Sequence, residues 1–169
     1  DMKEAFEEIG VTIHYQDQFL AAPTLVSGVG TSLRKACYTL LDVGGGHPAA
    51  YQVGGFSKLL SLDDAAPVYV VNPFRPWTKS LDSIDQTMLS ILGASRLTHV
   101  YLLGNPNLGY YTNADDILEG IARLDDMFDG VTTINSVCVK RELIDEVADK
   151  TDKYLLPIDL YLTYEWVER

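Results

Sequence analysis

The chain has 169 residues, enough for one domain with a sizeable hydrophobic core. Its 24 acidic and 13 basic residues give a formal charge of −11, and a surface of this charge repels nucleic acid and anionic lipid. No apolar run reaches transmembrane length, and the two cysteines lie singly in apolar runs, as buried thiols in a reducing compartment do. We therefore expect one cytoplasmic domain over residues 1–169 that binds neither nucleic acid nor membrane.

In the first third of the chain, helix and strand patterns alternate. Apolar residues at helical spacing predict a helix that ends at Gly10, a typical residue after a helix C-terminus. A short strand is predicted over residues 11–15 and a helical turn over 31–36. Residues 37–41 form an uninterrupted apolar and β-prone run that ends in Asp42, which is typical of a central parallel strand buried on both faces.

The remainder of the chain continues the alternation. A short helix broken at Gly54-Gly55 is predicted first, and Ser80 then caps a helix closed by Gly93. Thr112 and Asp115 have the spacing of a capping box for a further amphipathic helix. Strands are predicted over residues 68–71, 97–103 and 132–139, a helix around residues 143–147, and an extended tail over 158–167. This order predicts an α/β fold, a layered and mainly parallel sheet with helices on both faces.

Polar residues follow three of the predicted strands. They are residues 42–46, 72–75 and 105–107. The carboxyl ends of parallel strands share one edge of a sheet, and open α/β sheets bind their ligands at that edge. We therefore expect these three loops to gather into a site.

Asp42 and the glycines after it have two interpretations. A hydrophobic strand that ends in Asp resembles a Walker B element, whose carboxylate holds Mg²⁺ through water. Gly44 and Gly45 carry no side chain, so their backbone amides can approach a phosphate. Alternatively, Asp42 caps a turn and the glycines only permit positive φ. The two companion loops favour the functional interpretation.

The other two loops are equally ambiguous. The side-chain amides of Asn105 and Asn107 offer a donor and an acceptor to a purine edge, but an Asx turn imposed by Pro106 explains them as well. Arg75 suits a phosphate or a surface acid. His47 is the one candidate partner for Asp42 in acid–base chemistry, which would make the chain a small-molecule enzyme without nucleotide.

In order and spacing, several segments resemble the distal part of a P-loop ATP-binding protein of the CobQ/CobB/MinD/ParA-like group. These segments are residues 40–45, 70–76, 105–109 and 112–120. The resemblance implies a P-loop NTPase-like fold, ATP and Mg²⁺ as ligands, and a possible nucleotide-dependent homodimer. It also implies that Asp42 is the Walker B acid, Gly45 a switch glycine, and Asn105 and Asn107 neighbours of the adenine.

The chain departs from this group in three respects. Its acidic surface argues against the DNA-binding and membrane-attaching branches of the group. The Walker A loop with its lysine is absent from these residues, and Gly46-His47 stands where related sequences commonly place an acid. We expect the N-terminal unit of the fold to be missing and the chain alone to be inactive, whether or not the parent protein is an ATPase. The expected function is the distal portion of an ATP-binding switch protein. The alternative is a non-catalytic, oligomerising interaction module on a P-loop-like scaffold.

Overall fold

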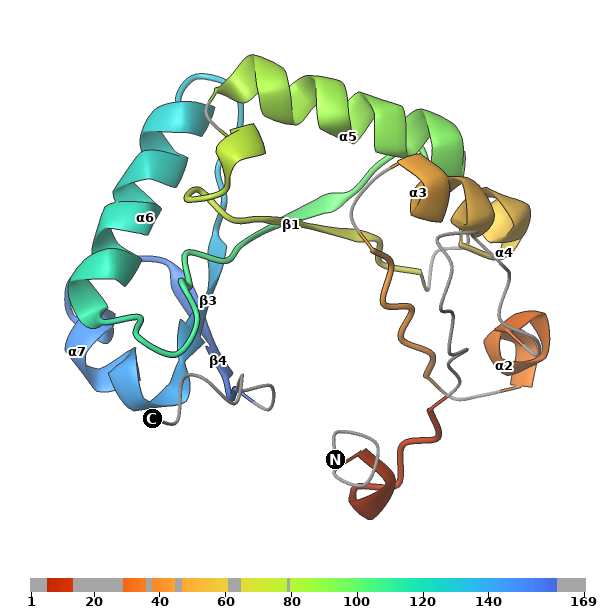
Figure 1. The fold of residues 1–169 in the computed structure, drawn as a ribbon, viewed down its shortest axis with the longest axis horizontal. Helices are drawn as coiled ribbons and strands as arrows, with labels where there is room; N and C mark the ends of the chain where they lie inside the picture. Colours follow the sequence, from red (N-terminus) through yellow and green to blue (C-terminus); the bar gives the residue numbers. More distant parts are fainter. Residues whose placement is uncertain are drawn as a thin grey trace. The chain divides into compact units, whose positions relative to one another are not determined.

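The computed structural model describes residues 6–13, 29–35, 38–44, 47–60, 65–78 and 80–160 (Figure 1). The chain is divided into two compact units. The first comprises Asp1–Ala66 and Leu89–His99, and the second comprises Pro67–Met88 and Val100–Arg169. Within the described residues, no helix combines the length and the hydropathy that crossing a membrane requires.

The first unit contains short helices. They are α2 (Val29–Lys35), α3 (His47–Val53), the 3-10 turn η1 (Gly54–Phe56) and α4 (Ser57–Leu60). The predicted interruption at Gly54-Gly55 is confirmed, because α3 ends there. A Cβ on Gly54 would lie 2.6 Å from the carbonyl oxygen of Ala94, so a side chain at this position would prevent the observed close approach.

The predicted stop at Gly10 is also confirmed. Residues 6–8 are helical, and Gly10 has a φ of +80°. The Val11 amide donates to the Phe6 carbonyl at 2.9 Å and the Gly10 amide to the Glu7 carbonyl at 3.0 Å, which is the Schellman arrangement. Residues 11–13 form no strand, and the rest of that predicted strand lies outside the described residues.

The predicted central strand over residues 37–42 is wrong for its described part. Residues 38–44 have no strand pairing, and the side chains of Tyr38 and Leu40 are 96% and 92% exposed. A strand exists only where a neighbouring strand takes up its backbone groups, and an apolar run in the sequence cannot supply that neighbour. Here the hydroxyl of Thr39 donates instead to the carbonyl of Ser32 at 3.3 Å.

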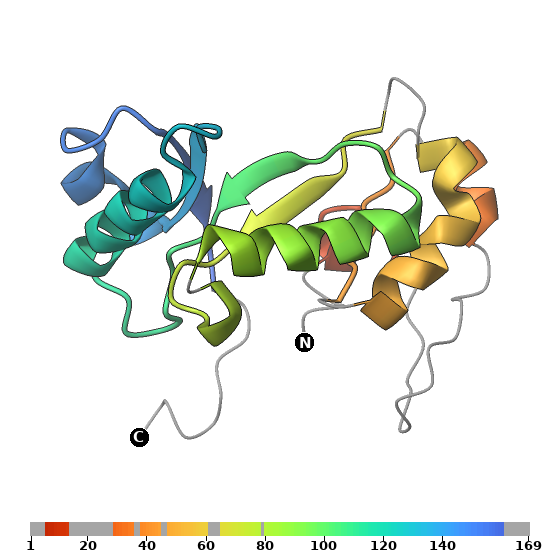
Figure 2. The ribbon, with the colours of Figure 1, turned by 90° about the horizontal axis from the view of Figure 1, so that it is seen from above.

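The second unit is built on a four-stranded sheet in which every neighbouring pair is parallel. Figure 2 shows the first two strands of the sheet, yellow and green, running in the same direction. The strands follow the order β1 (Val68–Val71), β2 (Tyr101–Gly104), β3 (Ser136–Lys140) and β4 (Tyr154–Ile158). This confirms the α/β class and the parallel sheet. Pro157 weakens the strand pattern of β4 in the sequence, but β4 is an edge strand among the described strands, and an edge strand tolerates proline.

The helices of this unit follow the predicted pattern with shifted ends. They are η2 (Pro76–Thr78), α5 (Leu81–Ser95), α6 (Ala114–Phe128), η3 (Arg141–Leu143) and α7 (Ile144–Ala148). The Ser80 hydroxyl accepts the Ser83 amide at 3.3 Å, which confirms the N-cap. The stop at Gly93 is wrong, because α5 runs on to Ser95 and Arg96 takes the left-handed position with a φ of 57°. The α5 residues after Met88 count with the first unit.

Helices α6 and α7 and the first half of α5, up to Met88, lie along one face of the sheet (Figure 1). Alternate strand residues, including Val71, Val137 and Val139, are buried against these helices in two apolar clusters. The residues between them point the other way, and several are exposed: Val68, Val70, Tyr101, Tyr154 and Leu156. Among the described residues of this unit, the helical layer therefore covers one face.

Close approach of α6 to the sheet depends on two glycines. A Cβ on Gly104 would lie 2.8 Å from Leu124, and a Cβ on Gly120 would overlap Pro106 and lie 3.0 Å from the Phe74 ring. Pro106 and Phe74 belong to the loops after β2 and β1. The absence of a side chain at position 120 therefore lets α6 rest directly on both loops.

We predict that Gly120→Ala lowers the free energy of unfolding by about 1–3 kcal/mol, the usual cost of overpacking a tight contact. Gly93→Ala is the matched control, because Gly93 lies in the last turn of α5 and its Cβ would meet nothing within 4 Å. Alanine there should raise stability by about 0.5–1 kcal/mol through its helix propensity. Urea denaturation measures both, and equal effects of the two substitutions would contradict the packing argument.

Candidate functional site

Two of the three predicted loops meet at the carboxyl edge of the sheet in the second unit. Asn72 follows β1, and Asn105 and Asn107 follow β2. The amide of Asn105 donates to the carbonyl of Val71 at 2.8 Å, and Asn72 Nδ2 donates to the carbonyl of Asn107 at 2.9 Å. The prediction that these two loops lie together is confirmed.

The side chain of Asn107 lies inside this edge and is 9% exposed. Its Nδ2 donates to Asn105 Oδ1 at 2.7 Å and to the carbonyl of Cys138, in β3, at 2.9 Å. Both amide hydrogens are thereby used, which fixes which end of the amide is nitrogen. Asn107 Oδ1 is buried and has no hydrogen-bond partner among the described residues. Asn107 therefore joins the ends of β2 and β3 and is not the Asx turn that Pro106 suggested.

Asn105 is positioned by this contact. It is half-buried, and its Oδ1 faces the Nδ2 of Asn107. The Asn105 Nδ2 therefore remains a donor, for which no acceptor is found among the described residues. A carboxamide oxygen has two lone pairs, so the Asn105 Oδ1 keeps one after accepting from Asn107. Asn105 thus presents a donor and an acceptor in a fixed orientation.

The loop after β1 is held by its own hydrogen bonds. Asn72 Oδ1 accepts from the amide of Phe74 at 2.9 Å, which is the Asx turn of this edge. The Thr78 hydroxyl is buried, 2.7 Å from the Asn72 carbonyl and 2.8 Å from the Arg75 carbonyl. The sequence did not identify Thr78 as a residue that holds this loop, because a single threonine after Trp77 matches no turn or capping motif.

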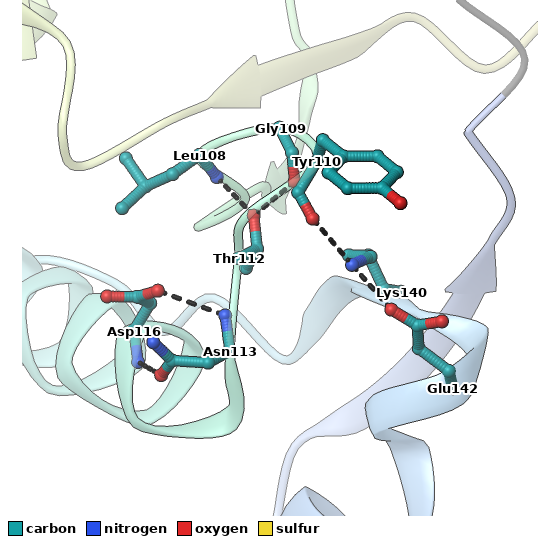
Figure 3. A network of polar contacts seen from close by, with 8 residues as sticks. All are labelled: Leu108, Gly109, Tyr110, Thr112, Asn113, Asp116, Lys140 and Glu142. Atoms are coloured by element: carbon teal, nitrogen blue, oxygen red, sulfur yellow. Dashed lines mark hydrogen bonds and ion pairs between the residues drawn. The ribbon is translucent and has the colours of Figure 1, made fainter. Parts of the chain in front are cut away.

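The loop between Asn107 and α6 is closed by the neighbouring pair Thr112 and Asn113 (Figure 3). The prediction of Thr112 and Asp115 as the capping box is wrong by one residue. Asn113 is the N-cap and exchanges hydrogen bonds of 3.0 Å with Asp116. Thr112 instead closes the preceding turn, because its hydroxyl accepts the Leu108 amide at 2.8 Å and donates to the Gly109 carbonyl at 2.7 Å.

Lys140, at the end of β3, supports this loop from the other side (Figure 3). Its Nζ donates to the Tyr110 carbonyl at 2.9 Å, pairs with Glu142 at 2.5 Å, and lies 5.8 Å from the centre of the Tyr110 ring. The rings of Tyr110 and Tyr111 meet edge to face, with their centres 5.3 Å apart. Both tyrosines remain exposed, so the rim beside Asn107 carries aromatic surface.

The predicted phosphate-side residues belong to the first unit. Asp42 and Gly44 are both exposed, in the segment of residues 38–44 that forms no strand. Gly45 and Gly46 lie outside the described residues, as does the side chain of His47. In the described part of the chain, no three His, Cys, Asp or Glu side chains lie close enough together to hold a metal ion. A carboxylate that holds Mg²⁺ through water does not need such a group.

Comparisons with models of protein families, with curated proteins and with solved structures find no match to this chain. What the structure defines is therefore the class: an α/β protein whose parallel sheet ends in a polar cluster of Asn72, Asn105 and Asn107.

We predict that Asn107→Asp lowers the free energy of unfolding by about 3 kcal/mol or more at neutral pH. The new carboxylate would be buried and would face two hydrogen-bond acceptors, Asn105 Oδ1 and the Cys138 carbonyl. Asn135→Asp makes the same change at an exposed position and should stay within about 0.5 kcal/mol of the parent. Thermal unfolding at neutral and acidic pH measures the difference. A loss for Asn107→Asp that does not shrink on acidification would contradict a charge-based cause.

Proposed function

We propose that this chain is the distal portion of an ATP-binding switch protein, and that Asn105 reads the adenine base at the carboxyl edge of the sheet. The single observation that carries the proposal is the fixed amide of Asn105, whose Oδ1 is held by Asn107 and whose Nδ2 is left as a donor. Ligands of open α/β sheets bind at this edge, which agrees with the position of Asn105.

The chemistry favours adenine over guanine. Adenine presents an N6 donor beside an N7 acceptor, and an asparagine side chain matches that pair with its oxygen and nitrogen. Guanine presents the O6 acceptor in place of the donor, so the lone pair of Asn105 Oδ1 would face another lone pair. Asn107 is the positioning residue in this arrangement, because it decides which end of the Asn105 amide faces inward.

The phosphate side of the proposal rests on the resemblance to the CobQ/CobB/MinD/ParA-like group. Asp42 would hold Mg²⁺ through water, and the amides of Gly44 and Gly45 would approach the phosphates. Bound Mg²⁺ neutralises phosphate charge in proteins of this kind. A P-loop NTPase-like sheet with helices on both faces, a cytoplasmic location and a homodimer formed with nucleotide belong to the same proposal. The proposal also includes that the protein binds neither nucleic acid nor membrane.

The base site can be tested without phosphates. We expect adenosine to shift the Asn105 side-chain amide and the backbone amides of residues 105–108 saturably in ¹H–¹⁵N spectra of the chain. Asn105→Ala should weaken adenosine binding roughly tenfold or more, since a matched bidentate contact contributes about 1–3 kcal/mol. Guanosine should bind less tightly than adenosine by a comparable factor.

Asn135→Ala is the matched control, because Asn135 is an exposed asparagine of the same unit that lies before β3. It should leave adenosine binding unchanged. Equal affinity for guanosine and adenosine, or shifts confined to residues away from the loop after β2, would contradict base reading by Asn105.

One observation favours the alternative of an oligomerising interaction module. Among the described strands, β1 ends the sheet, and its Val68 and Val70 are each 51% exposed beside the exposed Tyr101. An apolar edge strand of this kind pairs readily with another chain. Sedimentation of the chain with and without nucleotide separates the two functions. Association that needs no nucleotide and is abolished by Val70→Lys would favour the module.

A further inference from the structure

The second unit carries a cleft away from the asparagine cluster, where the loop after β1 meets the first turn of α5 and the last turns of α6. Its volume is about 650 Å³, within the range of small-ligand pockets. Phe74, Leu81 and Met127 supply apolar walls, and the charged residues that line it are Arg75, Arg123 and Asp126. Figure 2 shows the start of α5 beside the end of α6.

The charged residues that line the cleft are more basic in composition than the chain as a whole. Two arginines and one acidic residue line the cleft, whereas the whole chain has 24 acidic and 13 basic residues. The N-terminus of α5, a helix of 15 residues, adds partial positive charge at Ser80 and Leu81. An anion would therefore find two guanidiniums and a helix N-terminus at this cleft, opposed in part by Asp126, by Asp82 in the first turn of α5 and by Glu119, which pairs with Arg123.

Arg123 is held in place before any ligand arrives. Its guanidinium carbon lies 4.9 Å from the centre of the Phe74 ring, and its Nη2 binds Glu119 Oε1 at 2.5 Å. Phe74 is fixed in turn by Asn72 Oδ1, which accepts its amide. The Arg123 side chain is nevertheless 51% exposed, so the rest of its fork of donors faces solvent.

We propose that this cleft binds a carboxylate through Arg75 and Arg123, with the apolar part of the ligand against Phe74, Leu81 and Met127. Arginine forks match the geometry of carboxylates and phosphates alike. Asp126 decides between them, because its charge repels a phosphate dianion more than a carboxylate monoanion. The carboxylate belongs either to a free organic acid or to an acidic side chain of a peptide.

The test is a titration of the chain with benzoate, followed by ¹H–¹⁵N spectra. We expect saturable shifts at Phe74, Arg75, Leu81 and Arg123. Arg75→Gln and Arg123→Gln should each weaken binding about tenfold or more, the range for losing a hydrogen bond to a charged group. Asp126→Asn should strengthen it. Arg141→Gln is the control, because it removes the same charge from an exposed arginine paired with Asp159.

Two further titrations identify the ligand. Inorganic phosphate should bind more weakly than benzoate, and tighter binding of phosphate would overturn the carboxylate assignment. The third ligand is a short end-blocked peptide with one glutamate. Tighter binding of the peptide than of benzoate would assign the carboxylate to a peptide side chain, and tighter binding of benzoate would assign it to a free acid. Either result supports carboxylate binding at the cleft. Equal losses in Arg141→Gln and Arg123→Gln would overturn it. The outcome is independent of base reading, because adenosine is expected to shift residues 105–108 instead.

Discussion

A buried primary amide has two N–H groups to satisfy, and Asn107 gives one to the Cys138 carbonyl in β3 and the other to the side chain of Asn105. Its own backbone carbonyl accepts from Asn72. One residue therefore links the ends of three parallel strands, although β2 and β3 share only the Gly104–Val137 pair in their ladder. The edge of the sheet keeps its shape through side-chain hydrogen bonds where backbone pairing is sparse.

This construction explains why the site lies at an edge and not inside the apolar core. The core clusters are formed by residues of α6, α7 and the strands, including Val139 and Val147, which need only shape and hydrophobicity. The asparagines need specific partners at specific distances, because an unmatched amide in a buried place costs free energy. Gly120 connects the two regions, since its missing side chain brings α6 down onto the loops that carry the asparagines.

Much of the sheet could be predicted because its signals are local. Residues 68–71 are uniformly apolar, and α6 repeats apolar residues every three or four positions, so both elements were found. The capping box was misplaced because Thr112 and Asn113 are both able to cap, and both have an acid three residues on. The apolar run over residues 37–41 misled for another reason: hydrophobicity predicts a strand only if a partner strand takes up its backbone hydrogen-bonding groups. Likewise, the orientation of Asn105 depends on Cys138, which lies 31 residues beyond Asn107.

Asn72 gives the two proposed sites a common support. Its Nδ2 binds the Asn107 carbonyl on the base side, and its Oδ1 binds the Phe74 amide on the cleft side. Phe74 carries the guanidinium of Arg123, and Thr78 ties the same loop to the carbonyls of Asn72 and Arg75. A displacement of the loop after β2 must therefore either break the Asn72 hydrogen bond or move the loop after β1 with it. Because these contacts are short and partly buried, moving together costs less than breaking them.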